Sequence, residues 1–219
     1  MNRLIDHTLL KATATEADIE KLCREAREHS FKSVCVNPCF VKRAKEFLAD
    51  SGVLVCTVVG FPLGANATSI KVHETEQAVR DGADEIDMVI NIGRAKEGDF
   101  VYVEKEIAAV VQAAAGRTVK VIIETCYLSD EEKVEACKAA ASAGAAFVKT
   151  STGFGTAGAT VEDVALMRRS VPAEMGVKAS GGIRTPEDLK AMVEAGANRI
   201  GASAGRKLIQ GGKDGDSAY

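Results

Sequence analysis

Two lysines lie inside short apolar stretches, where a charged side chain is not expected. Lys149 lies within AAFVKTSTGFG (145–155), and Lys178 lies within GVKASG (176–181). Two ammonium groups at short range disfavour each other's protonation, and burial acts in the same direction. A neutral amine near physiological pH is the nucleophile that forms a Schiff base with a carbonyl compound. The two lysines therefore predict Schiff-base chemistry if the fold brings them together.

Further charged residues occur near the C-terminal halves of other apolar runs, namely Asp6, Asp87, Lys120 and Glu124. In a parallel sheet covered on both faces, such charges point into a site or pair with one another. A structural ion-pair network is the alternative for any single residue. Asp87 is a candidate acid–base group for an imine, or else it neutralises Lys178. Lys120 and Glu124 share strand parity, so we expect them to form a pair that holds Lys178 and Asp87 in place.

Short β-branched runs alternate with amphipathic stretches along the whole chain. The runs that predict strands are 4–8, 32–37, 53–61, 84–91, 118–125, 146–152, 176–181 and 198–203. Thr15 is a possible N-cap of the first helix, and three of the helices are expected to end at Gly82, Gly144 and Gly196. Such regular alternation predicts parallel strands joined by helices.

Eight strand–helix units in 219 residues predict an α/β fold, a single (β/α)8 TIM barrel with its chemistry at the C-terminal ends of the strands. A doubly wound open sheet is the competing architecture, but neither a G-x-G-x-x-G turn nor a P-loop pattern is present. We assign residues 1–210 to the barrel and residues 211–219, GGKDGDSAY, to a flexible C-terminal tail.

Composition narrows the class of partner. The chain has 46% hydrophobic and 27% charged residues and a formal net charge of −3, so it offers no basic field for nucleic acid. Neither a leader peptide nor an apolar run long enough to span a membrane is evident, and we expect a cytoplasmic protein. The cysteines lack paired spacing and the three histidines share no ligand spacing, so neither a disulfide framework nor a metal site is expected.

Six motifs together resemble the deoxyribose-phosphate aldolase family, class I aldolases of the barrel type: VKTSTGFG, VKASGGIRT, EIDMVIN, VKVIIET, LIDHTLL and GFPLG. The resemblance covers essentially the whole chain. It implies that Lys149 forms a Schiff base with acetaldehyde, that Lys178 favours loss of the Lys149 proton, and that Asp87 relays protons through water. The implied reaction is the reversible cleavage of 2-deoxy-D-ribose 5-phosphate to acetaldehyde and D-glyceraldehyde 3-phosphate, without a metal or organic cofactor. We also expect a homo-oligomer, either a dimer or a tetramer.

Glycine-rich loops predict where a phosphate binds. The candidates follow the sixth, seventh and eighth strands: Gly153; Gly181, Gly182 and Arg184; Gly201 and Ser203. This is the usual phosphate position in such barrels, although glycines that only form turns are the alternative. Phe154 and Ala204 stand where some family members carry a lysine and a second serine, so we expect Arg184 to supply more of the positive charge.

Four further residues have two interpretations each. Asp6 and Thr8 either orient the substrate or cap the following turn, and Cys35 lies either at the barrel mouth or in the core. The resemblance implies that Tyr219, the last residue, reaches into the active site, whereas a disordered end is the alternative.

Three other functions compete with this prediction. The first is another Schiff-base barrel aldolase, of the transaldolase or bisphosphate type, which would not release acetaldehyde. The second is a non-catalytic sugar-phosphate-binding barrel, which has no use for two adjacent lysines. The third is a metal-dependent phosphosugar epimerase, which the missing histidine–carboxylate cluster disfavours.

Overall fold

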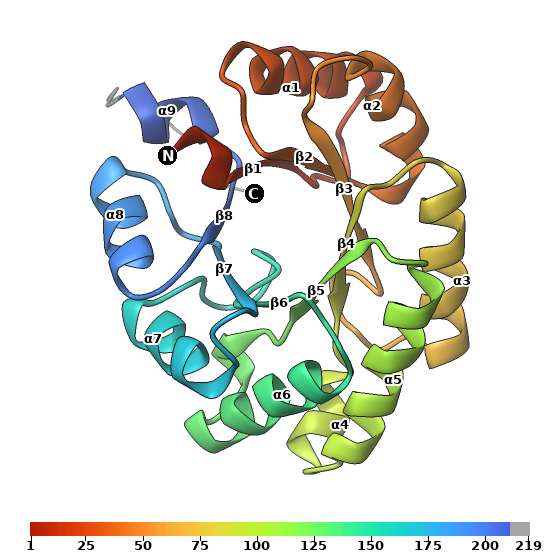
Figure 1. Ribbon diagram of the computed structural model, residues 1–219, viewed down its shortest axis with the longest axis vertical. Helices are drawn as coiled ribbons and strands as arrows, with labels where there is room; N and C mark the ends of the chain where they lie inside the picture. The colour runs from red at the N-terminus through yellow and green to blue at the C-terminus, as the bar shows by residue number, and fades with distance from the viewer. Residues whose placement is uncertain (211–219) are drawn as a thin grey trace.

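A closed barrel of eight parallel strands forms the centre of the molecule, and helices surround it (Figure 1). The computed structural model describes residues 1–210. Tyr219 and the tail assignment lie outside these residues. The strands are β1 (Ile5–Leu9), β2 (Ser33–Val36), β3 (Leu54–Val59), β4 (Glu85–Val89), β5 (Thr118–Ile122), β6 (Phe147–Lys149), β7 (Gly176–Ser180) and β8 (Arg199–Ala202). Each pairs with the next along the chain, and β8 pairs with β1, which confirms the predicted (β/α)8 barrel.

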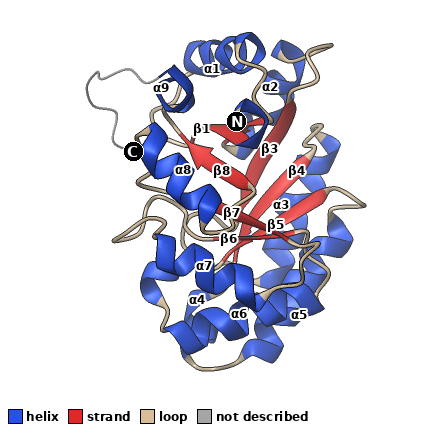
Figure 2. Ribbon diagram, turned by 60° about the vertical axis from the view of Figure 1, so that its left-hand side comes forward, coloured by secondary structure: helices blue, strands red, loops and turns tan. Residues whose placement is uncertain are grey.

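Helices fill the connections between the strands, and Figure 2 shows them packed outside the tilted strands. They are α1 (Glu16–Glu28), α2 (Val41–Phe47), α3 (Thr68–Arg80), α4 (Ile92–Lys96), α5 (Phe100–Ala113), α6 (Asp130–Ser142), α7 (Val161–Ser170), α8 (Pro186–Glu194) and α9 (Gly205–Gln210). Short 3-10 turns occupy Asn2–Leu4 (η1), Pro38–Phe40 (η2) and Thr125–Tyr127 (η3). No helix within residues 1–210 is long and apolar enough to cross a membrane.

Local sequence signals mark the helix ends as predicted. The Thr15 side chain accepts a hydrogen bond from the backbone N–H of Asp18, which satisfies a donor that the first turn of α1 leaves unpaired. Gly82, Gly144 and Gly196 have φ of 101°, 78° and 113°. Glycine reaches this region without steric cost, so the chain can turn from each helix into the next strand.

Seven of the eight strands are shorter than the sequence predicts, and the early ends of β5 and β6 have a visible cause. β5 was expected to continue to residue 125 but ends at Ile122, because Glu124 takes a left-handed conformation with φ of 53°. β6 was expected over 146–152 but ends at Lys149. There the Thr150 side chain donates to the backbone carbonyl of Ser180 on β7, so the chain leaves the strand direction directly after Lys149.

The apolar core lies between the strands and the helices. Alternate strand residues such as Val34, Val148 and Val177 are fully buried in a cluster shared with helix residues such as Ile19 and Ile107. Because side chains alternate between the two faces of a strand, the other residues of each strand point into the barrel. Those inward positions hold most of the charged residues described below.

A buried ion pair outside the barrel fixes the end of β4. Lys71 on α3 and Glu106 on α5 are almost completely buried, and their Nζ and Oε2 atoms lie 2.9 Å apart. Lys71 donates to the backbone carbonyl of Val89 at 2.8 Å, and Glu106 accepts from the backbone N–H of Asn91 at 3.0 Å. Burial lowers the pKa of Lys71 and raises that of Glu106, and in each case the charge of the partner opposes the effect of burial.

We predict that Lys71→Met lowers the free energy of unfolding by about 3–5 kcal/mol, because Glu106 is left as an uncompensated buried charge. The double variant Lys71→Met/Glu106→Gln is expected to recover part of this loss, since glutamine is neutral and still accepts from Asn91. Urea unfolding of the three proteins measures the difference. Equal destabilisation in the single and double variants would show that packing, rather than the buried charge, is responsible.

Candidate active site

One carboxylate binds three lysines inside the barrel. Strand pairing places Asp87 beside Lys120, and Lys149 beside Lys178. Lys149 Nζ and Lys178 Nζ each lie 2.8 Å from Oδ2 of Asp87, and Lys120 Nζ lies 2.8 Å from its Oδ1. The two lysines singled out by their apolar surroundings therefore meet at the same oxygen atom.

A second group of charges extends the network toward the N-terminal ends of the strands. Asp6 on β1 contacts Lys178 Nζ at 2.5 Å and Arg199 Nη1 on β8 at 2.9 Å. Glu85 on β4 contacts the same Arg199 atom at 2.9 Å and Lys120 Nζ at 2.7 Å. The charged side chains thus form one continuous network.

The network keeps the carboxylates of Asp87 and Asp6 ionised. Burial alone would raise the pKa of Asp87, but Lys120, Lys149 and Lys178 outweigh it and hold that pKa well below its usual range. Asp6 behaves in the same way, because Lys178 and its cationic neighbours outweigh the effect of burial and lower its pKa.

Lys178 and Lys120 remain protonated for the converse reason. Burial would lower the pKa of Lys178, but Asp6 and Asp87 outweigh it and raise that pKa. The pKa of Lys120 is raised as well, since Asp87 is the largest of several charges that oppose the effect of burial. Asp87 thus stabilises the charge on Lys178, which is the alternative role that the sequence indicated for it.

Lys149 differs from the other two lysines in its exposure. It is 3% exposed, whereas Lys120 and Lys178 are completely buried. It is also the last residue of β6, at the C-terminal end of the barrel, where enzymes of this fold bind substrate. Of the three lysines, Lys149 is therefore the one that retains exposed surface.

Known proteins resemble this chain over nearly its full length. The model of the DeoC/LacD family aldolases matches residues 1–211. A deoxyribose-phosphate aldolase from Caldanaerobacter subterraneus is 63% identical over 211 residues, covering 95% of this chain and 91% of that protein. One from Brevibacillus brevis is 59% identical over 219 residues, covering 100% of this chain and 99% of its own.

This chain belongs to the DeoC/LacD family of aldolases. Its fold agrees with that of a solved relative, a deoxyribose phosphate aldolase from Aeropyrum pernix, with a TM-score of 0.89 and 35% identity. That match covers 95% of this chain and 89% of the relative.

Glu124 has a different partner in this aldolase from the one predicted. It accepts hydrogen bonds from the backbone N–H and the hydroxyl of Thr152, at 3.1 Å and 2.5 Å. Within residues 1–210, the carboxylates paired with Lys120 are Asp6, Glu85 and Asp87, so the expected pair of Lys120 and Glu124 is wrong. The left-handed conformation at Glu124 breaks the strand parity on which that prediction depended. Burial raises the pKa of Glu124, although Thr152 and Lys149 oppose this.

Two thiols lie beside the network. Cys56 Sγ is 3.1 Å from Asp87 Oδ1 and 3.3 Å from Lys120 Nζ. Cys35 is fully buried, and a hydrogen bond from Cys56 lowers its pKa against the effect of burial. Within the described part of the chain, Cys35, Cys56 and Asp87 are the set whose ligand atoms come within 4.8 Å of one another. Three lysines already bind the oxygens of Asp87, so we assign no metal to this set.

The other predicted phosphate-binding residues lie in the loops that follow β6, β7 and β8, and Thr8 lies on β1. The loop after β6 meets the loop after β7, since a Cβ at Gly181 would lie 3.0 Å from Cα of Gly158 and 3.7 Å from Cα of Gly153. Arg184 is exposed, and its backbone N–H donates to Asp188 at 3.0 Å. Gly182 is exposed and Ser203 is half-buried, and both lie in the loops that follow β7 and β8. The Thr8 hydroxyl donates to the backbone carbonyl of Asp6.

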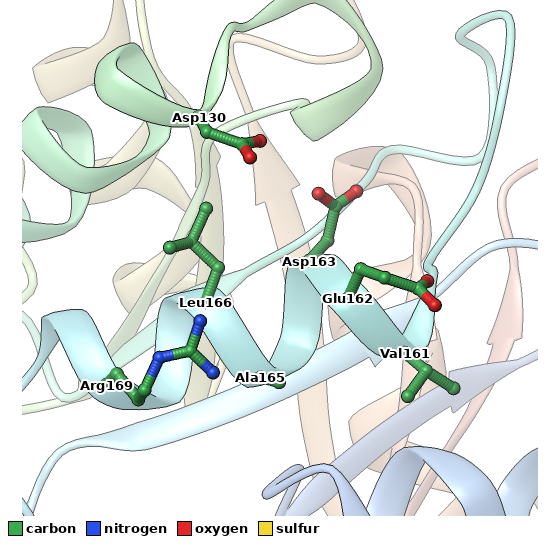
Figure 3. A pocket seen from close by; sticks show the side chains of 7 residues that line it. All are labelled: Asp130, Val161, Glu162, Asp163, Ala165, Leu166 and Arg169. Atoms are coloured by element: carbon green, nitrogen blue, oxygen red, sulfur yellow. The ribbon is translucent and has the colours of Figure 1, made fainter.

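A groove of about 370 Å3 on the outside of the barrel is unrelated to this network. Figure 3 shows it between Asp130 at the start of α6 and residues of α7 that include Glu162 and Arg169. None of the predicted site residues lines it. The chemistry is therefore assigned from the ion network rather than from the shape of this groove.

Sequence reasoning missed Glu85 and Arg199. A signal for Glu85 was present, because it lies two residues before Asp87 on the same strand and so shares its face. Arg199 likewise lies two residues before Gly201, a predicted site residue on β8, and so shares its face of the strand. Neither residue was among the charged candidates chosen from the sequence.

Gly201 lies within β8 rather than in the loop after it, where the sequence analysis placed it, and it has a further role. A Cβ at this residue would lie 3.2 Å from Cε of Lys178 and 3.0 Å from Cβ of Ser180. Both distances are tighter than ordinary van der Waals contacts. The absence of a side chain at Gly201 therefore leaves the space through which Lys178 reaches Asp87.

We predict that Gly201→Ala displaces the Lys178 amine and lowers kcat by roughly tenfold to a hundredfold, because small displacements in an active site have large effects on rate. Gly93→Ala on α4 is the matched control, since its Cβ would lie 3.4 Å from Oδ1 of Asn91, the N-cap of that helix. Steady-state cleavage assays with circular dichroism compare the two variants. Unchanged kcat in Gly201→Ala would mean that Lys178 has room to move.

Proposed function

We propose that the protein is a class I aldolase that cleaves 2-deoxy-D-ribose 5-phosphate reversibly to acetaldehyde and D-glyceraldehyde 3-phosphate through a Schiff base on Lys149. The observation that supports this most directly is the Lys149 amine at the barrel mouth, 2.8 Å from a carboxylate that also holds Lys178. Relatives about 60% identical to this chain are named deoxyribose-phosphate aldolases.

The proposed reaction begins when the neutral Lys149 amine adds to the aldehyde carbon of the open-chain sugar. Asp87, in hydrogen-bond reach of Nζ, relays the protons that convert the carbinolamine to an imine and water. The protonated imine then accepts the electron pair of the breaking carbon–carbon bond. The hydroxyl next to that bond loses its proton and leaves as the aldehyde group of D-glyceraldehyde 3-phosphate. Protonation of the remaining enamine and hydrolysis release acetaldehyde and restore Lys149.

Lys178 supports this cycle by staying charged. Its ammonium group shares Oδ2 of Asp87 with Lys149, so it weakens the hold of that carboxylate on a Lys149 proton. Asp6 also contacts Lys178 and keeps it in position. We propose that Lys178 thereby favours the neutral form of the nucleophile.

We propose that the phosphate of the substrate binds at the loops after β6, β7 and β8. Gly181 and Gly182 have φ of 84° and 78°, a conformation in which successive N–H groups of a loop can form an anion-binding concavity. Ser203 offers a hydroxyl from the neighbouring loop, and Arg184 offers a charge. Gly153 lies in the β6 loop, whose close approach to the β7 loop depends on Gly158, because a Cβ at Gly158 would lie 2.3 Å from the carbonyl oxygen of Gly181.

The finer biological assignments are also proposals. A sugar phosphate derived from deoxynucleotides would place the enzyme in carbohydrate degradation in the cytoplasm, where phosphorylated sugars are retained. All six cysteines lie within residues 1–210 and none forms a disulfide, which agrees with a reducing compartment. We propose a homo-oligomer, because the relative from Aeropyrum pernix is described as tetrameric.

Trapping with acetaldehyde and borohydride tests the nucleophile. We predict that reduction adds an ethyl group to Lys149, since borohydride converts the imine to a stable secondary amine, and that peptide mass mapping locates it. Lys190, an exposed lysine on α8, reports non-specific labelling. Labelling at Lys178 alone, or at neither buried lysine, would overturn the assignment of Lys149.

Substrate discrimination tests the phosphate site. We predict that Arg184→Ala raises KM for deoxyribose 5-phosphate about tenfold and leaves KM for unphosphorylated deoxyribose nearly unchanged, because only the first carries a dianion. Arg169→Ala, in the outer groove between α6 and α7, is the control. Equal losses on both substrates in Arg184→Ala would point to a structural role in the loop.

A further inference from the structure

The charges inside the barrel do not balance. The network has three carboxylates and four cations: Asp6, Glu85 and Asp87; Lys120, Lys149, Lys178 and Arg199. With all of them ionised, one positive charge is left over. An uncompensated charge in a buried site is unfavourable, so the network is stabilised when one cation loses its proton.

The contacts identify which cation that is. Arg199 has a guanidinium group, which does not lose its proton in proteins. Lys120 contacts three carboxylates, and Lys178 contacts two. Lys149 contacts one carboxylate, Asp87, and shares it with both other lysines. Lys149 therefore gains least from remaining charged.

We propose that Arg199 and Glu85 are positioning residues that set the charge state of the Lys149 amine from the floor of the barrel. The floor is the level at which β8 begins at Arg199 and β4 begins at Glu85. Arg199 supplies the fourth cation and so creates the positive excess, and Glu85 limits that excess to one charge. This inference rests on the proposed function, because it concerns the nucleophile of that reaction. Neither residue touches the reacting atoms, so each acts through the network.

A continuous path of contacts joins the floor to the nucleophile. Arg199 Nη1 lies 2.9 Å from Asp6 Oδ1, and Asp6 Oδ2 lies 2.5 Å from Lys178 Nζ. Lys178 and Lys149 both lie 2.8 Å from Asp87 Oδ2. Strand pairing places Arg199 beside Lys178 and Lys178 beside Lys149. Arg199 is therefore two strands away from Lys149, which corresponds to about 10 Å. At an effective dielectric constant of about 20, one unit charge at that distance shifts a titration by about one pH unit.

Other titratable groups near Lys149 are not part of this path. Glu124, after β5, is bound to Thr152. Cys56 on β3 contacts Asp87 and Lys120, and Cys35 on β2 is hydrogen-bonded to Cys56. These groups are the same in every variant below, so the differences between variants report the charges at positions 85 and 199.

The test uses four variants of the whole enzyme and the pH dependence of kcat/KM for deoxyribose 5-phosphate cleavage, which reports the free enzyme. Arg199→Met makes cations and carboxylates equal in number, and the acidic limb is expected to move up by about one pH unit. Glu85→Gln increases the positive excess, and the limb is expected to move down by a similar amount. Arg199→Met/Glu85→Gln restores an excess of one, and Arg199→Lys retains it, so both are expected to keep the limb near its wild-type position.

Opposite shifts in the two single variants, with recovery in the double variant, would support the inference, because a merely structural role does not change sign. A limb that stays within a few tenths of a pH unit of wild type in Glu85→Gln would overturn it, even if Arg199→Met did not fold. Borohydride trapping at Lys149 across the same pH range separates the two hypotheses. Absence of trapping in the wild type contradicts the proposed function, whereas wild-type trapping with unmoved limbs contradicts the present inference alone.

Discussion

The carboxylate of Asp87 is the interaction on which the interior of this barrel depends. Its two oxygens bind the amines of Lys120, Lys149 and Lys178, which come from three consecutive strands. Without this acceptor, three ammonium groups would face one another in a space closed to solvent, and their burial would be strongly unfavourable. The closed parallel barrel makes the arrangement possible, because it brings β4 within reach of both β6 and β7 across its interior.

The same constraint explains the polar floor of the barrel. Arg199 lies with its guanidinium 5.1 Å from the centre of the Phe147 ring, and a side chain at Gly176 would overlap that ring. Phe147 and Arg199 thus pack together at the N-terminal ends of β6 and β8. Glu85 and Asp6 compensate the charge of Arg199, so this packing residue also belongs to the electrostatics of the site.

The sequence was sufficient to predict the barrel and the meeting of Lys149 with Lys178, because both follow from the alternation of elements and the adjacency of consecutive strands. It was not sufficient for pairings across the barrel. The contact of Arg199 with Glu85 joins β8 to β4, which no local pattern relates. Glu124 shows a second limit, since one left-handed residue reversed the face that its parity predicted.

Lys149 and Lys178 are the same residue type and lie opposite each other where β6 pairs with β7, but the two strands end at different points. β6 ends at Lys149, whereas β7 continues to Ser180, whose hydroxyl donates to the backbone carbonyl of Ser151. This hydrogen bond ties the chain after β6 across the end of β7, above Lys178. Lys178 is therefore covered and paired with two carboxylates, while Lys149 is paired with one and remains 3% exposed. The different roles that we propose for Lys149 and Lys178 thus follow from where each strand ends.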